Sequence, residues 1–171
     1  MISESICPAD TMDLPSLLEI YNHYATTTHH TFDTEASSPD KFRNWFGQFS
    51  TTGPHRLLVA ESGGAILGYA NSRSFHPKPV YAQTVETGIF IKQGHKAAGI
   101  GMRLYQALLE ILFAETDVHQ IVASVTLPNE ASLRLHSKLG FREVGTFPEI
   151  GFKEGQHWDL CWLIRPAHES T

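Results

Sequence analysis

The sequence predicts an α/β fold in which helices cover both faces of one mixed β-sheet. Segments with the strand period and segments with the helical period follow one another in the order β, α, α, β, β, β, α, β, α, β, β. Residues 55–61 and 65–75 are apolar runs on either side of Ser62-Gly63-Gly64, and this arrangement predicts an antiparallel hairpin. Residues 119–126 are almost continuously apolar, which is typical of a strand covered on both faces.

The composition suits a single globular domain over residues 1–171. Of the 171 residues, 42% are hydrophobic and 18% are charged, which is enough apolar material for a full core. The formal net charge is −5 and there is no run of Lys or Arg, so we expect neither nucleic acid nor an anionic membrane as a partner. The first twenty residues contain no apolar block, and no segment approaches membrane-spanning length. We therefore expect a cytoplasmic protein.

The cysteines and histidines do not predict a metal site. Cys7 and Cys161 lie far apart in the chain and lack C-x-x-C spacing, so we expect two buried thiols. The ten histidines include the adjacent pair His29 and His30, whose side chains would point in different directions on a helix or a strand. No set of His and Cys residues has the spacing of a ligand group, so we expect no bound metal.

The first third of the chain predicts a strand, two helices and a loop. Residues 3–8 form the strand, and Asp10 is an N-cap before a helix that runs to about Tyr24. Residues 26–35 have neither period and predict a loop. Ser38 and Pro39 begin the second helix, whose aromatic stripe we expect in the core.

Residues 84–114 have the most informative pattern, a strand followed by a glycine-rich turn and a helix. Glu86 lies on one face of the predicted strand, opposite its apolar face. Small residues at 97–101 let the backbone approach a ligand closely. The first N–H groups of the following helix are unpaired and carry the positive end of its dipole. This arrangement predicts a binding site for a phosphate group. The apolar face opposite Glu86 carries Val85, Thr87, Ile89 and Ile91.

Two common phosphate-binding motifs do not fit this turn. Gly94 and Gly99 have the spacing of the two P-loop glycines, but Ile100 and Gly101 stand where that motif needs Lys and then Ser or Thr. Gly99 and Gly101 could begin a dinucleotide fingerprint, but Leu104 replaces its third glycine and no βαβ unit opens the chain. A glycine turn before a helix is also common as a simple connection.

The last third of the chain predicts a strand, a short helix and a hairpin. The strand covers residues 119–126, and the helix begins at Asn129 and ends at Gly140 as its C-cap. Residues 141–152 and 158–164 form the two strands of the hairpin.

The turn residues Lys96-Ala97-Ala98-Gly99-Ile100-Gly101 resemble the Q/R-x-x-G-x-G/A loop of the GNAT superfamily of N-acetyltransferases, which holds the diphosphate of acetyl-CoA. Further blocks resemble the phosphinothricin and methionine sulfoximine N-acetyltransferases over nearly the whole chain, namely YNHYATTTHHTFDTE, TVETGIFI, LYQALL, LPNEASLRLHSKLGF, and GFKEG followed by WD. The resemblance implies a GNAT-like fold with a mostly antiparallel sheet that is splayed at its middle. It also implies direct acetyl transfer from acetyl-CoA to the primary amine of a small amino-acid-like substrate, and it is compatible with a homodimer.

The resemblance also implies where the coenzyme binds. Its pantetheine arm would pair like an extra strand with residues 89–91, and Gly88 inside this strand predicts a bulge that leaves backbone groups unpaired. The implied coenzyme contacts are Ile89, Phe90, Ile91, Lys96, Ala97, Ala98, Gly99, Ile100, Gly101, Met102, Asn129 and Ser132.

Two residues are candidates for the proton transfers. An ammonium group must lose a proton before it can attack a thioester, and Glu86 beside the loop is the candidate base, with an ordinary solvated acid as the alternative. The departing thiolate needs a proton, and the superfamily pattern N-x-x-A/S-x-x-x-Y-x-x-x-G-F has its tyrosine replaced here by His136. His136 is therefore the candidate general acid, with a helix histidine bonded to a backbone carbonyl as the alternative.

An amino-acid acceptor needs a cation for its carboxylate and a shaped wall for its side chain. Arg73 matches an arginine of the sulfoximine-type enzymes, with a surface arginine as the alternative, and Phe32 is either a core residue or part of a substrate wall. Other functions remain open, namely acetylation of a peptide N-terminus or another amine, and a non-catalytic acetyl-CoA sensor that needs no base. The implied acceptor contacts are Phe32, Arg73, Phe75, Tyr81, Thr84 and Lys153.

Overall fold

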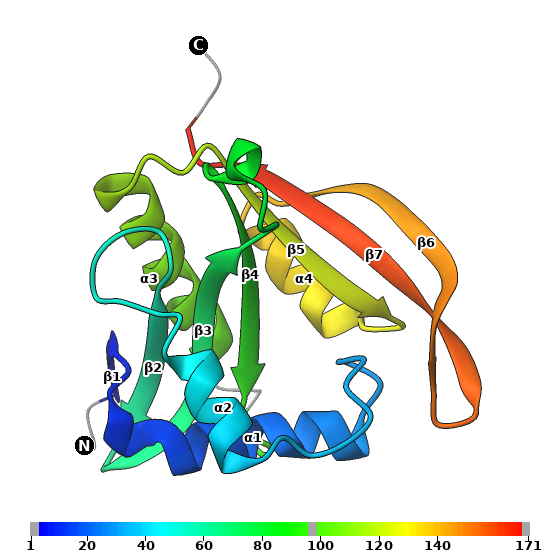
Figure 1. Cartoon of the computed structure of the whole chain (residues 1–171), viewed down its shortest axis with the longest axis horizontal. Helices are drawn as coiled ribbons and strands as arrows, with labels where there is room; N and C mark the ends of the chain where they lie inside the picture. The colour runs from blue at the N-terminus through cyan, green and yellow to red at the C-terminus, as the bar shows by residue number, and fades with distance from the viewer. Residues whose placement is uncertain (1–3, 96–98, 169–171) are drawn as a thin grey trace.

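The computed structural model describes residues 4–95 and 99–168, and it confirms the predicted order of elements (Figure 1). The described strands form one seven-stranded sheet in the order β1-β2-β3-β4-β5-β7-β6. The strands are β1 (Glu4–Pro8), β2 (Leu57–Ser62), β3 (Ala65–Ser74), β4 (Thr84–Ile91), β5 (Gln120–Leu127), β6 (Arg142–Lys153) and β7 (Gln156–Pro166). The α-helices are α1 (Leu14–Thr27), α2 (Pro39–Phe46), α3 (Ile100–Glu115) and α4 (Glu130–Lys138), with 3₁₀ turns η1 (Thr11–Asp13) and η2 (Pro79–Tyr81).

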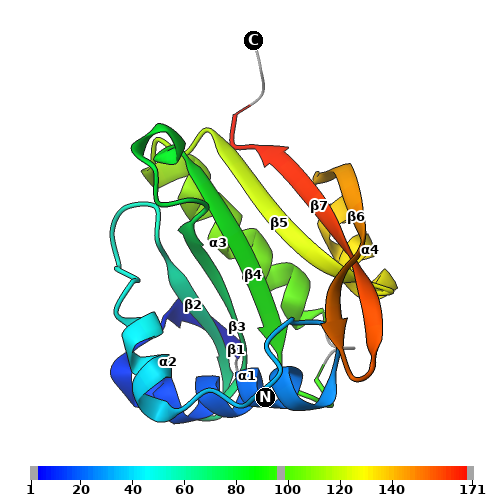
Figure 2. The same ribbon diagram turned by 45° about the vertical axis from the view of Figure 1, so that its right-hand side comes forward.

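The sheet is mixed and has helices on both faces, as the sequence predicted. Only β4 and β5 pair in parallel, while the other neighbouring strands of the described sheet pair antiparallel. Helix α3 covers one face, where Leu104, Leu108 and Leu112 are fully buried against the sheet (Figure 2). Helices α1 and α2 cover the other face, where Leu17 and Tyr69 are fully buried. Each such side chain contributes about 1.5–3 kcal/mol of apolar transfer free energy, so the two cores hold the sheet rigidly between them.

The first helix extends further than its sequence suggested. Asp10 and Asp13 form the N-terminal capping box of η1, which leads directly into α1. The helix continues to Thr27 rather than ending near Tyr24, because residues 25–27 contain neither Gly nor Pro and the end of the helix is stabilised locally. The Thr27 hydroxyl donates to the carbonyl of His23, one turn back.

The sheet opens between β4 and β5. Their ladder joins only Thr84, Val85 and Glu86 to residues 120–122, and beyond this point the strands separate. The bulge predicted at Gly88 is wrong, because β3 and β4 keep an unbroken register as far as Ile91. The opening therefore arises from divergence of two strands and not from an extra residue in one of them. This splay confirms the sheet shape that the sequence resemblance implied.

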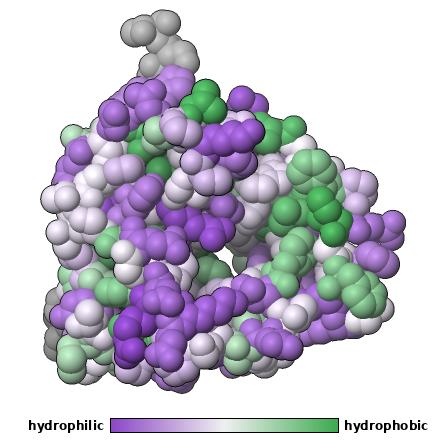
Figure 3. Space-filling model, viewed as in Figure 1, coloured by the Kyte–Doolittle hydropathy of each residue, from purple (hydrophilic) through white to green (hydrophobic). Residues whose placement is uncertain are grey.

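Strands β6 and β7 form a long hairpin, which we call the arm, at the far edge of the sheet (Figure 1). The turn at Glu154 and Gly155 has positive φ angles at both residues and lies between the two strands of the predicted hairpin. Figure 3 shows hydrophobic residues gathered over the arm and a hollow between the arm and the rest of the molecule. No helix in the described part of the chain is both long enough and apolar enough to cross a membrane.

Candidate active site

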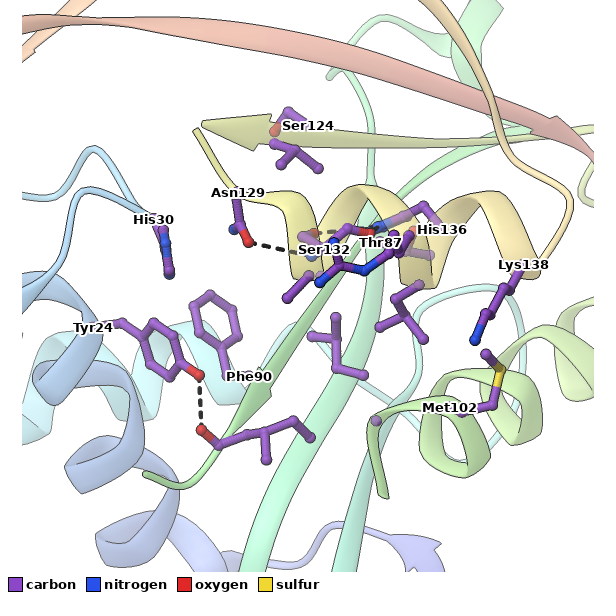
Figure 4. A pocket seen from close by; sticks show the side chains of 18 of the residues that line it. Tyr24, His30, Thr87, Phe90, Met102, Ser124, Asn129, Ser132, His136 and Lys138 are labelled. Atoms are coloured by element: carbon purple, nitrogen blue, oxygen red, sulfur yellow. Dashed lines mark hydrogen bonds between the residues drawn. The ribbon is translucent and has the colours of Figure 1, made fainter. Parts of the chain in front are cut away.

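A cavity of about 420 Å³ lies where β4 and β5 separate. Its walls come from β4, β5, the start of α3, the length of α4, Tyr24 of α1, and His30 in the loop after α1 (Figure 4). Among the residues that the structure describes, the cavity lining includes the cationic side chains of Arg134 and Lys138 and no carboxylate, although the chain carries a net charge of −5. A cavity with this lining suits an anionic ligand.

The start of α3 opens into this cavity. Gly99 is the N-cap, with a left-handed φ of 69° that glycine adopts without strain, and no side chain among residues 4–95 and 99–168 caps the helix. Gly99, Gly101 and Met102 all line the cavity. The first amides of α3 therefore bring the positive end of the helix dipole to the cavity, which is the arrangement that binds phosphate.

Most of the implied coenzyme contacts meet in this cavity. Asn129 is the N-cap of α4, and its Oδ1 accepts a hydrogen bond from the backbone N–H of Ser132 at 3.2 Å. The side chain of Ile100 is only 3% exposed and packs in the core, so the predicted contact of this residue with the coenzyme would be made by its backbone. Lys96, Ala97 and Ala98 lie outside the described residues. The implied contacts that line the cavity are Ile89, Phe90, Ile91, Gly99, Gly101, Met102, Asn129 and Ser132.

Glu86 lies beside the cavity and is held from two sides. Its Oε2 lies 3.0 Å from Nη2 of Arg73, and its Oε1 accepts a hydrogen bond of 3.2 Å from the hydroxyl of Ser124. The Glu86 side chain is 15% exposed and is not part of the cavity lining, whereas Ser124 is. The carboxylate is thus fixed next to the cavity through Ser124 and remains within reach of solvent.

His136 lines the cavity and is 3% exposed. Its Nδ1 lies 2.8 Å from the backbone carbonyl of Ser132, so the hydrogen bond expected for a purely structural helix histidine is present. Its Nε2 lies 3.1 Å from the hydroxyl of Tyr105. Burial lowers the pKa of His136, and the bond to the Ser132 carbonyl opposes this effect. His136 is therefore a buried side chain with a fixed orientation. Its protonated ring gives up a proton more readily than the protonated ring of a solvent-exposed histidine does.

The implied acceptor residues fall into two groups. Arg73 pairs with Glu86, and near it the ring of Phe75 packs edge-on against Tyr81 and against Trp162 of β7. Thr84 begins β4 in the same region. Phe32 and Lys153 form the second group, where the loop after α1 meets the arm. Within the described residues, no hydrogen bond or ring contact joins the two groups.

Lys153 holds this loop in place. Its ammonium donates hydrogen bonds of 2.8 Å to the carbonyls of Ala25 and Thr31, and burial lowers its pKa. Phe32 lies against Gly151 of β6 so closely that a Cβ at Gly151 would overlap its ring. Lys153 thus has a clear structural role beside its predicted contact with substrate, and that contact stays a prediction.

Sequence reasoning missed several residues of this site. Ser124 is a polar residue in the middle of a mostly apolar strand, and Tyr105 carries a hydroxyl on the leucine-rich face of α3; both were detectable signals. Tyr24 donates to the carbonyl of Ile91 at 2.8 Å, which nothing in its local sequence indicates. Among residues 4–95 and 99–168, no cluster of three or more His, Cys, Asp or Glu residues could hold a metal ion.

Proteins with similar sequences and structures are acetyltransferases. Residues 6–162 match the model of the acetyltransferase (GNAT) domain. The chain is 46% identical to a phosphinothricin N-acetyltransferase of Streptomyces coelicolor, over 90% of this chain and 91% of that protein. It is 32% identical to an L-methionine sulfoximine/L-methionine sulfone acetyltransferase of Pseudomonas aeruginosa, over 95% of this chain and 94% of that protein. A crystal structure of a phosphinothricin acetyltransferase from Sinorhizobium meliloti in complex with AcCoA matches with a TM-score of 0.92 at 27% identity, over 98% of this chain and 90% of that chain.

Proposed function

Because the chain belongs to the GNAT family of N-acetyltransferases, we propose that it transfers the acetyl group of acetyl-CoA to the primary amine of a small amino-acid-like substrate. The relatives named for phosphinothricin and for methionine sulfoximine support this substrate class. We further propose that the 171 residues act as one catalytic domain. The single observation that carries the proposal is the cavity in the opened sheet, which is lined by residues at the start of α3.

The coenzyme is bound by the start of α3 and by β4. The first amides of α3 and the cations on α4 hold the diphosphate. The backbone of residues 89–91, which no longer pairs with β5, offers its polar groups to the pantetheine arm. The acetyl group then lies between β4 and β5, near the carboxylate of Glu86, which Arg73 and Ser124 hold in place.

Glu86 removes a proton from the substrate ammonium, directly or through one water. The free amine attacks the thioester carbonyl, and backbone N–H groups that face the cavity stabilise the resulting oxyanion. When the carbon–sulfur bond breaks, the thiolate leaves with the electron pair and takes a proton from His136. Conversion of the ammonium group to an amide releases two protons. The thiolate takes up one of them to become the free thiol, so the reaction releases one proton overall at neutral pH.

Direct transfer predicts that both substrates are bound at once. Initial rates with varied acetyl-CoA and amine should then give intersecting double-reciprocal lines, whereas parallel lines would indicate an acetylated enzyme and would contradict direct transfer.

Release of free thiol should be measured over a panel containing phosphinothricin, methionine sulfoximine, common amino acids and a short peptide with a free N-terminus. Turnover of the peptide alone would move the assignment to N-terminal acetylation. Binding of acetyl-CoA with no turnover of any amine would favour a sensor.

We also propose that the protein is a cytoplasmic homodimer joined through the arm. Strand β6 is an edge strand of the sheet, and its apolar side chains are more than half exposed. Light scattering should give a dimer mass for the wild type and a monomer mass for Phe147→Glu. Met12→Glu is the matched control, because Met12 is 83% exposed and far from the arm in sequence. The exposed side chains on β6 are Val144, Phe147, Ile150 and Phe152.

A further inference from the structure

A buried chain of hydrogen bonds joins His136 to the centre of the sheet. The hydroxyl of Tyr105 lies 3.1 Å from Nε2 of His136 and 2.6 Å from Oγ1 of Thr87. Thr87 Oγ1 in turn lies 3.2 Å from the backbone carbonyl of Val122. Tyr105 is fully buried between α3, α4, β4 and β5, whereas Thr87 and His136, which are 5% and 3% exposed, both line the cavity.

The positions of the protons on this chain follow from its acceptors. The carbonyl of Ser132 can only accept, so Nδ1 of His136 carries a proton whether the ring is neutral or charged. When the ring is neutral, Nε2 accepts, Tyr105 donates to it, and Thr87 donates to Tyr105. When the ring is charged, Nε2 donates to Tyr105, Tyr105 donates to Thr87, and Thr87 donates to the carbonyl of Val122. Every donor has an acceptor in both states.

We propose that Tyr105 is a positioning residue for His136, and that Thr87 in turn orients Tyr105. Together they allow the buried imidazole to gain or lose a proton at Nε2 by rotation of two hydroxyl hydrogens, while all heavy atoms stay in place. The catalytic meaning of this chain rests on the proposed function, in which His136 protonates the departing thiolate. The chain itself rests only on the geometry.

Tyr105 does not supply the proton. Burial raises its pKa well above the ordinary value for tyrosine, and its side chain does not line the cavity. The chain also ends at a backbone carbonyl, which accepts hydrogen bonds and carries no proton to pass on. Of the three side chains, His136 and Thr87 line the cavity and Tyr105 does not. Tyr105 therefore acts only by determining how readily the buried ring carries charge.

Few charged groups face this chain. Glu86 of β4 and Arg165 of β7 act electrostatically on Tyr105 with opposite sign. Arg134 and Lys138 lie on α4 with His136, and both are exposed to solvent. Since an unpaired charged donor costs more than an unpaired neutral acceptor, loss of the Tyr105 hydroxyl penalises the charged imidazole more than the neutral one. Tyr105→Phe should therefore lower the pKa of His136.

The test is a pH titration of His136 by NMR of the full chain with labelled histidine, in the wild type, Tyr105→Phe and Tyr69→Phe. Tyr69 is the matched control, because it is equally buried but its hydroxyl has no hydrogen-bond partner among the described residues. We expect a lower His136 pKa and a changed Nε2 signal in Tyr105→Phe, with wild-type values in Tyr69→Phe. An unchanged titration in Tyr105→Phe, or the same change in Tyr69→Phe, would overturn the proposal.

Kinetics separate this inference from the proposed function. If His136 donates the proton, the basic limb of the kcat profile should move to lower pH in Tyr105→Phe, and kcat at neutral pH should fall about tenfold. A changed titration without turnover of any amine by the wild type would retain the positioning role and remove the proposed function. If Tyr105→Phe does not fold, Thr87→Val should lower the His136 pKa and Thr87→Ser should restore it. Equal titrations in that pair would overturn the proposal.

Discussion

Ser124 donates its hydroxyl hydrogen to Oε1 of Glu86 at 3.2 Å, and of these two residues only Ser124 lines the cavity. The bond joins Glu86, the last paired residue of β4, to Ser124, which lies two residues beyond Val122, the last paired residue of β5. With Arg73 on its other oxygen, the carboxylate of Glu86 has a fixed orientation before any substrate arrives. A base held in this way does not have to reorganise during the reaction.

Glu86→Gln should lower kcat by about 100-fold or more, because the amide keeps the shape of the side chain but cannot accept the proton. The affinity for acetyl-CoA, measured by calorimetry, should change little, since Glu86 is outside the cavity lining. Glu115→Gln is the matched control, because Glu115 also pairs with an arginine, Arg56, at 2.8 Å. Wild-type turnover in Glu86→Gln would remove Glu86 from the role of base.

Arg73→Gln should impair substrates that carry a carboxylate more than amines that lack one. The Arg73 side chain is 48% exposed, so its guanidinium can bind a substrate carboxylate while it pairs with Glu86. We expect kcat/KM for an amino acid to fall about tenfold more than kcat/KM for the corresponding decarboxylated amine. Equal losses for both substrates would show that Arg73 acts only by holding Glu86.

Gly151→Ala should weaken binding of the amine and leave binding of acetyl-CoA unchanged. A Cβ at Gly151 overlaps the ring of Phe32, so the loop after α1 must move away from the arm. Gly145→Ala on the same strand is the matched control, because a Cβ there meets nothing within 4 Å. The measurement is KM for each substrate in both variants. An unchanged KM for the amine in Gly151→Ala would exclude Phe32 from the acceptor site.

The elements of this fold could be predicted because each depends on local patterns. Apolar periodicity gave the order of strands and helices, and capping residues such as Asp10, Ser38 and Asn129 marked where helices begin. The glycine turn before α3 was also a local signal. The bulge expected at Gly88 was wrong because a glycine in a strand has several explanations, and only the neighbouring strand shows which one applies.

The partners of the site residues could not be predicted in the same way. Tyr105 and His136 are 31 positions apart, and the ammonium of Lys153 reaches Ala25 across 128 positions. Such contacts depend on how α3 and α4 pack and on how the arm bends toward α1. The sequence resemblance indicated which residues gather at the site, but the hydrogen bonds that orient them follow only from the packed structure.

Acid should destabilise the protein through His136. Burial lowers the pKa of this group in the folded state, whereas the unfolded chain keeps a value near the ordinary 6.5. Above pH 6.5 the imidazole is neutral in both states and its contribution is constant. As the pH falls from 6.5 toward the folded-state pKa, the unfolded chain binds a proton that the folded protein does not, so the free energy of unfolding decreases.

Urea unfolding at pH 7.5, 6.5 and 5.5 measures this loss. His136→Phe starts from lower stability, because it removes the hydrogen bonds of the ring to the Ser132 carbonyl and to the Tyr105 hydroxyl, but it should lose less stability over this interval than the wild type. His157→Gln is the control, because His157 is exposed, and the stability of this variant should depend on pH as that of the wild type does. Tyr105→Phe should show a larger loss, because removal of its hydroxyl lowers the folded-state pKa of His136 further. Parallel pH curves for the wild type and His136→Phe would place the acid sensitivity elsewhere in the protein.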